Sequence, residues 1–265
     1  QLQAHGVHLE QGAANNRIGN VQPGDRNVIS GNARHGVGFW HVGTTGNLII
    51  NNIIGLSPDG TRRLSNRLHG ADINYGASNN VIGGSQAAER NVISGNNGSG
   101  AEISHGGTTT NNLIRGNFIG TFVTGMGGAG YTSNSNYGVS MKDRVVNNMV
   151  EENVIGNSLG GGLNIDNFGN CCTSNNTVRN NRIGISLSGS SIGNAFYGIN
   201  IMAPNSKIGP GNIIANNPVG IQVGGEASDG NTITQNSIFA NAGLGIDLAP
   251  TLGQVNPNDE GDGDT

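Results

Sequence analysis

The sequence predicts an all-β chain, folded as a single-stranded right-handed parallel β-helix (a β-solenoid) of about nine rungs. Three observations lead to this prediction. A glycine followed by an apolar–x–apolar triplet recurs along the chain, asparagine-led apolar pairs recur between these triplets, and mostly Gly, Asn, Ser and Thr separate them. Each piece is too short to be a stable strand alone, so it needs a copy of itself directly above and below.

The glycine-led motif defines the rungs. Its spacing varies from 22 residues (Gly198 to Gly220) to 38 residues (Gly100 to Gly138), which indicates a constant core with variable loops. The motif is found nine times, at 6–9, 36–39, 70–73, 100–103, 138–141, 162–165, 198–201, 220–223 and 245–248. We therefore expect nine equivalent strands in one stack.

The asparagine-led motif supplies the remaining strands and the corners. It occurs at 27–32, 47–55, 91–96 and 112–120, with weaker copies at 176–184 and 231–238. Each turn of the chain thus contributes about three short strands separated by sharp corners. Gly and Asn best tolerate the positive φ that such corners need, and Asn at one corner of successive turns can pass amide hydrogen bonds along the stack. Rungs about 4.8 Å apart give a rod roughly 40 Å long.

Composition agrees with a narrow stacked core and limits the partners. Glycine accounts for 47 of 265 residues, and only 11% of residues are charged. The net charge of −4 provides no basic surface, so we expect no nucleic-acid partner. No apolar run reaches the length of a membrane span. The two cysteines, Cys171 and Cys172, are adjacent, and we expect two small turn residues rather than a strained disulfide.

The repeated words NVISGN, NNxIG and G-V-x-I resemble those of right-handed parallel β-helix repeat proteins, the pectate-lyase-like superfamily that includes many secreted bacterial β-solenoids. The resemblance covers 6–248. It implies the fold and an extracellular location, but no particular reaction. We expect a β-helix over 1–250 and an acidic C-terminal tail over 251–265. The tail residues Asp259, Asp262 and Asp264 offer hard oxygens that suit Ca²⁺, and an acidic disordered end is the alternative.

Three long loops interrupt the regular turns, at 56–69, 121–137 and 185–197. Each follows an Ile-Gly pair and precedes a glycine-led strand. We therefore expect all three to project from the same side of the rod, either as a functional surface or as tolerated insertions.

The aligned rungs place residues at equal offsets from the leading glycine in columns, and the middle rungs gather charged and aromatic side chains on one patch. The six histidines show no metal-ligand spacing. The patch is predicted to contain Trp40, His41, Asp72, Tyr75, Glu102, His105, Lys142, Asp143, Arg144 and Asp166, overhung by Arg62, Arg63 and Arg67 from the first long loop.

Read functionally, the patch suits an acidic polysaccharide. In a polysaccharide lyase or epimerase, Tyr75 or His105 would abstract the proton α to the carboxyl group, with Lys142 and Arg144 beside them. The substrate would be bound by Trp40, His41, Asp72, Glu102, Asp166, Arg62 and Arg63. Asp72 and Glu102 could instead hold Ca²⁺ or form a carboxylate pair for hydrolysis. Carbohydrate binding without cleavage, or a solvated face of mutually offsetting charges, are further alternatives.

The function that the sequence favours is structural. No strict catalytic motif such as Asp-Pro-His or Asp-Asp is present, no capping helix precedes residue 6, and 246–248 still follow the repeat. We therefore expect an extracellular structural or adhesive β-solenoid that associates end to end, as in a filament, rather than an enzyme. A lyase or epimerase, or a carbohydrate-binding protein, is the alternative.

Overall fold

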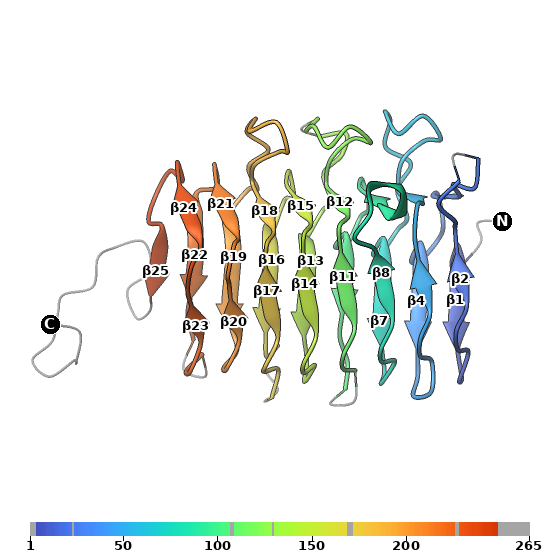
Figure 1. The fold of residues 1–265 in the computed structure, drawn as a ribbon, viewed down its shortest axis with the longest axis horizontal. Helices are drawn as coiled ribbons and strands as arrows, with labels where there is room; N and C mark the ends of the chain where they lie inside the picture. The colour runs from blue at the N-terminus through green and yellow to red at the C-terminus, as the bar shows by residue number, and fades with distance from the viewer. Residues whose placement is uncertain are drawn as a thin grey trace, which may run out of the picture.

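The chain folds into a parallel β-helix built from three parallel sheets. The structure is a computed structural model that describes residues 4–22, 24–106, 109–128, 130–168, 172–225 and 228–248. Figure 1 shows the rungs side by side along the long axis, from β1 at one end to β25 at the other. This confirms the predicted fold class of about nine rungs.

The first sheet contains all nine glycine-led strands, in chain order and parallel register. Its strands are β1 (Val7–Glu10), β4 (Val37–Trp40), β7 (Ala71–Asn74), β10 (Ala101–Ile103), β13 (Tyr137–Lys142), β16 (Gly161–Asp166), β19 (Tyr197–Met202), β22 (Val219–Val223) and β25 (Ile246–Leu248).

The second and third sheets have eight short strands each, formed by the asparagine-led pairs. The second contains β2 (Arg17–Ile18), β5 (Leu48–Ile49), β8 (Val81–Gly83), β11 (Leu113–Arg115), β14 (Met149–Glu151), β17 (Thr177–Arg179), β20 (Lys207–Ile208) and β23 (Thr232–Ile233). The third contains β3 (Val28–Ile29), β6 (Ile53–Ile54), β9 (Val92–Ile93), β12 (Phe118–Ile119), β15 (Val154–Ile155), β18 (Arg182–Ile183), β21 (Ile213–Ala215) and β24 (Ser237–Phe239). One short 3₁₀ helix, η1 (Ala87–Glu89), interrupts a corner. Within the described residues, no helix is long and apolar enough to cross a membrane.

The core consists of apolar side chains that occupy equivalent positions on successive rungs and stack in columns along the rod. In the second sheet the inward residue of successive rungs is Ile49, Ile82, Ile114, Val150 and Val178, and all five are fully buried. Because the register is parallel, each side chain packs on its counterpart one rung away. Burial of these branched side chains, each stabilising by about 1.5 to 3 kcal/mol, offsets the shortness of the individual strands.

Asparagine ladders run along the corners, as predicted. The longest links Asn27, Asn52, Asn91, Asn117, Asn153, Asn181, Asn212 and Asn236 by side-chain hydrogen bonds from one rung to the next. Their donor–acceptor distances are 2.8–3.1 Å. Each ladder satisfies backbone groups that a sharp buried corner would otherwise leave unpaired.

The leading glycines leave no room for a side chain. A Cβ at Gly100 would lie 2.6 Å from Ile119 Cγ2 and 2.7 Å from the Gly138 carbonyl oxygen. We expect Gly100→Ala to lower the free energy of unfolding by about 1 to 3 kcal/mol, because the next rung must shift. Denaturant unfolding measures it, with Gly24→Ala as the control, since a Cβ at Gly24 meets nothing within 4 Å. Equal stability of the two variants would contradict this packing.

The three long loops project from one side of the rod, as expected (Figure 1). They cover the outer face of the third sheet, where Leu56, Val123 and Ile192 pack on an apolar row that includes Val92 and Phe118. The loops therefore complete and cover a second, smaller apolar cluster on this face.

Cys172 is disulfide-bonded, which corrects the expectation that it is a simple turn residue. Cys171 lies outside the described residues, as do residues 251–265 with the proposed Ca²⁺ ligands Asp259, Asp262 and Asp264.

Candidate functional site

The predicted columns exist, and their register is as expected. Asp72 pairs with Glu102 on the next rung of the first sheet, and Glu102 pairs with Ser140. The side chains of this column point away from the core, yet Asp72 and Glu102 are only 1% and 3% exposed. The prediction of a solvated column therefore needs correction, because the flanking side chains lean over it. Both carboxylates are covered in this structure, so the face presents other groups to a ligand.

One of the covering rows consists of histidines that precede the leading glycines. His5, His35 and His69 each stand one residue before a leading glycine, so they stack on consecutive rungs. Their ring centroids are 5.3 Å apart for His5 and His35, and 5.1 Å apart for His35 and His69. The sequence analysis missed this row, which the position before each leading glycine would have revealed.

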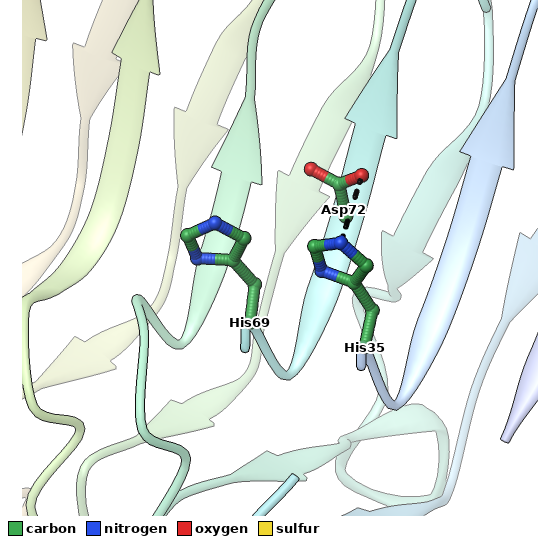
Figure 2. Close-up of side chains that lie close together, drawn as sticks. All are labelled: His35, His69 and Asp72. Carbon is green, nitrogen blue, oxygen red and sulfur yellow. Dashed lines mark ion pairs between the residues drawn. The ribbon is translucent and has the colours of Figure 1, made fainter. Parts of the chain in front are cut away.

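Asp72 on β7 lies at the centre of the covered cluster. Its carboxylate accepts a 2.5 Å hydrogen bond from Trp40 Nε1 and one of 3.2 Å from Asn74 Nδ2. Burial raises the pKa of the Asp72 carboxyl, although His69 and the Trp40 hydrogen bond oppose that shift. His35 Nε2 lies 3.8 Å from Asp72 Oδ2 (Figure 2). Burial, followed by electrostatic interaction with His69 and His5, lowers the pKa of His35 to about 3, so this contact is not an ion pair at neutral pH.

Glu102 on β10 is held by three neighbours. Lys142 Nζ lies 3.2 Å from Oε2, His69 Nε2 lies 3.4 Å from Oε1, and Ser104 Oγ lies 3.3 Å from Oε1. Lys142 also lies over the Phe168 ring, 4.9 Å from its centroid. The charge of Lys142, which the lyase reading places beside the catalytic base, is thus offset by Glu102.

The structure brings together a group with metal-ligand chemistry that the sequence spacing did not show. Among the described residues, ligand atoms of His35, His69 and Asp72 all lie within 4.8 Å of one another (Figure 2). His69 Nδ1, however, accepts a 2.9 Å hydrogen bond from the Ser99 backbone N–H, which places the ring proton on Nε2. Within the described part of the chain, His35 Nδ1 is buried without a hydrogen-bond partner. A metal-bound histidine usually donates its second N–H to an outer partner, so the arrangement fits a hydrogen-bonded cluster better than a metal centre.

The exposed part of the patch is a row of rings at the end of the first-sheet strands. His41, Tyr75 and His105 have φ angles of 74°, 52° and 52°. This left-handed corner turns their side chains outward, which resolves a direction that strict alternation left open. The rings of His41 and Tyr75 are 5.8 Å apart, and those of Tyr75 and His105 are 5.3 Å apart. The side chains of His41 and His105 are 46% and 45% exposed, and Tyr75 is 48% exposed.

On the next rung this row changes from aromatic to charged residues. Asp143 has the same left-handed backbone, but its side chain is buried. Its carboxylate oxygens lie 3.8 Å from His105 Nε2 and 3.6 Å from Arg144 Nε. Asp166 is paired in register with Lys142, and its carboxylate accepts the Phe168 backbone N–H at 2.8 Å. These predicted site residues therefore do lie together.

Arg62 and Arg63 of the first long loop do not overhang this patch. Arg63 Nε donates to the Gly95 carbonyl at 2.9 Å, and its Nη2 donates to Asn97 and Ser135, each at 2.9 Å. Its guanidinium thus fastens the loop to the following rungs. Arg62 lies exposed beside Asp59 at the loop tip. The exposed cation that the structure does add is Arg34, whose guanidinium lies 5.2 Å from the centre of the Trp40 ring.

Comparison with known proteins finds similarity only among solved structures. No protein-family model matches the chain, and no curated protein matches it. The A-module of the mannuronan C-5 epimerase AlgE4 from Azotobacter vinelandii is similar at 17% identity and a TM-score of 0.44, over 84% of this chain and 56% of that chain. The A-module of AlgE6 from the same organism is similar at 17% identity and a TM-score of 0.36, over 84% and 57%. This chain thus spans little more than half of either structure, and the likeness concerns the fold alone.

Proposed function

We propose that the chain binds an acidic polysaccharide along the outer face of the first sheet. The observation that carries the proposal is the row of His41, Tyr75 and His105. These three rings occupy consecutive rungs, lie beside one another and remain about half exposed. Exposed aromatic rings in an aligned row are costly in water unless a ligand covers them, and the apolar faces of sugar rings suit such a surface.

The row also fixes the direction of the bound polymer. Because one ring comes from each rung, an extended polymer lying on the row runs parallel to the long axis of the rod. Lys142 and Arg144 each lie beside a carboxylate, at Glu102 and Asp143. Among the described residues, no carboxylate lies within ion-pair distance of Arg34, so this exposed guanidinium is the group that favours an acidic over a neutral sugar.

Removing the central ring tests the proposal. Tyr75→Asn takes away the ring while Asn tolerates the positive φ, so the corner keeps its shape. We expect about a tenfold weaker affinity for pectate or alginate oligomers by calorimetry, given the usual worth of an aromatic contact. Phe239→Ser, which removes an exposed ring from the third sheet, should leave the affinity unchanged. Equal affinity of Tyr75→Asn and the wild-type protein for these oligomers would contradict the proposal.

A second candidate is lyase or epimerase chemistry at the same face. The specific observation is the exposed imidazole of His105 beside the phenol of Tyr75, both within the proposed binding row. A base there would remove the proton α to a uronate carboxyl group. An ultraviolet-absorbing unsaturated product from pectate or alginate would demonstrate elimination, and its absence together with unchanged sugar configuration would leave binding alone.

We further propose an extracellular location, in keeping with a polysaccharide ligand. End-to-end association stays a prediction. At the last described rung, Ile246 is 43% exposed, and such an apolar side chain suits packing against a further rung of this or another chain. Sedimentation over a range of protein and Ca²⁺ concentrations tests it, and a monomer throughout would exclude it.

A further inference from the structure

The exposed ring of His105 is connected to the buried carboxylate of Glu102 through one hydroxyl group. Ser104 Oγ lies 2.9 Å from His105 Nδ1 and 3.3 Å from Glu102 Oε1. A third neighbour, Asn74 Oδ1, lies 3.2 Å from the same Oγ. Ser104 is fully buried, and its backbone N–H donates to the Ile73 carbonyl at 2.9 Å, so the hydroxyl is fixed in place.

Ser104 has only one hydroxyl proton, and this determines which groups donate and which accept in these contacts. A serine hydroxyl has one proton to donate and two lone pairs that accept. Glu102 Oε1 and Asn74 Oδ1 can only accept, so the hydroxyl proton must point toward one of them to avoid two oxygen–oxygen repulsions. The shortest contact, to His105 Nδ1, is then one in which the ring nitrogen donates. His105 therefore carries its proton on Nδ1.

We propose that His105 is a proton-accepting residue of this face, whose Nε2 is kept as the unprotonated nitrogen by a relay through Ser104 to Glu102. The order of donors is His105 Nδ1–H to Ser104 Oγ, and Ser104 Oγ–H to Glu102 Oε1. His69 Nε2–H supports the same oxygen from the far side at 3.4 Å, and Lys142 balances the other carboxylate oxygen at 3.2 Å. Ser104 and Glu102 are thus positioning residues, as in other relays where a buried carboxylate orients a histidine.

The positive charge that His105 gains on accepting a proton is stabilised by Asp143. Asp143 Oδ2 lies 3.8 Å from Nε2, beyond hydrogen-bond distance but close enough to attract an imidazolium ring. With a uronate as proton donor, the C–H bond α to the carboxyl group breaks, its proton bonds to Nε2, and its electron pair remains in the enolate of the sugar. This chemical consequence rests on the proposed sugar binding, whereas the relay itself does not.

The tautomer of His105 is measurable without any ligand. Side-chain ¹⁵N resonances of the labelled protein at pH 8 separate the protonated from the bare ring nitrogen, and His105→Gln identifies the signals. We expect protonated Nδ1 and bare Nε2, which is the less common tautomer of free histidine. Protonated Nε2 in the wild-type protein would overturn the proposal without any further variant.

Three variants then test the role of the hydroxyl. Ser104→Ala should move the His105 proton to Nε2, and Ser104→Thr should restore it to Nδ1. Ser99→Ala is the matched control, because it removes a buried hydroxyl on the same rung that has no hydrogen-bond partner among the described residues, and keeps the N–H bonded to His69. A His105 tautomer that is identical in Ser104→Ala and wild type would refute the relay.

Deuterium uptake tests the chemical consequence separately. With pectate or alginate oligomers in D₂O, the wild-type protein should exchange the sugar proton α to the carboxyl group for deuterium. Ser104→Ala should slow this exchange by roughly tenfold or more with unchanged affinity. Binding without exchange in the wild-type protein would overturn the proton-transfer role and leave sugar binding intact, whereas loss of affinity in Tyr75→Asn bears only on binding.

Discussion

Replacement of Asn117 by alanine is expected to lower the free energy of unfolding by roughly 3 to 5 kcal/mol, although only one small polar side chain is changed. Asn117 Oδ1 accepts hydrogen bonds from the backbone N–H and the side-chain amide of Asn91, at 3.3 and 2.9 Å. Its Nδ2 donates to Asn153 Oδ1 at 3.1 Å and to the Ile82 carbonyl at 2.8 Å. The substitution therefore removes a hydrogen bond from each of four buried polar groups on the two neighbouring rungs.

The effect is large because the corner excludes water. Asn91, Asn117 and Asn153 are each fully buried, so no solvent molecule replaces the missing amide. Thermal unfolding monitored by circular dichroism measures the loss. The control is Asn136→Ala at another corner, whose partly exposed side chain makes no hydrogen bond among the described residues, and which should change stability by less than about 0.5 kcal/mol. Similar losses for both variants would show that the ladder is not what stabilises the corners.

The ladders also explain why so much of the fold was predictable from the sequence. In a parallel stack, every rung uses the same residue types at its corners and at its inward positions, so the spacing of the repeat predicts which residues pair. The pairing of Asp72 with Glu102, and of Glu102 with Ser140, follows from counting residues after each leading glycine. Long-range contacts, usually the hardest to infer, here become a short-range pattern.

The site was less predictable because its geometry depends on contacts between side chains of different rungs. The column count placed Asp72 on an outer face correctly, but it could not show that Trp40 and the histidine row cover it. Likewise, the loop with Arg63 leaves the correct side of the rod, yet packs on the third sheet because Leu56 is buried there. These outcomes depend on local packing of unique side chains, which a repeat does not encode.

The histidine row predicts a strong acid sensitivity of the first rungs. His35 is neutral in the folded chain at pH 7 because burial, followed by electrostatic interaction with His69, His5, Arg34 and His8, lowers its pKa to about 3. In the unfolded chain its pKa returns to about 6.5. Between these values the unfolded state binds a proton that the folded state does not, so stability is fully present above pH 6.5 and falls as the pH decreases.

The loss from His35 alone should reach about 3 kcal/mol at pH 4. His5 adds to it in the same direction, because burial, together with His8 and Arg34 and opposed by Glu10, lowers its pKa to about 4. The groups that face His35 are the His5 and His69 rings, the edge of Trp40 and the carboxyl of Asp72, itself favoured in its neutral form by burial. The Asp72 carboxyl is the one acidic group among them, and burial raises its pKa, which weakens the counter-charge that it offers a protonated His35.

The variant that isolates this effect is His35→Phe, which keeps a stacked ring but cannot be protonated. Its stability should decline less steeply than that of the wild type between pH 6.5 and 4, whatever its stability at pH 7. Asn117→Ala is the matched control, since it should lower stability at every pH without changing the slope of stability against pH.

Because each rung contacts only its neighbours, the acid effect should be local. Hydrogen exchange should accelerate first in β1, β4 and β7, while β16 and β19 stay protected. Parallel stability curves for His35→Phe and wild type, or uniform loss of protection along the rod, would show that the buried histidines do not govern acid unfolding.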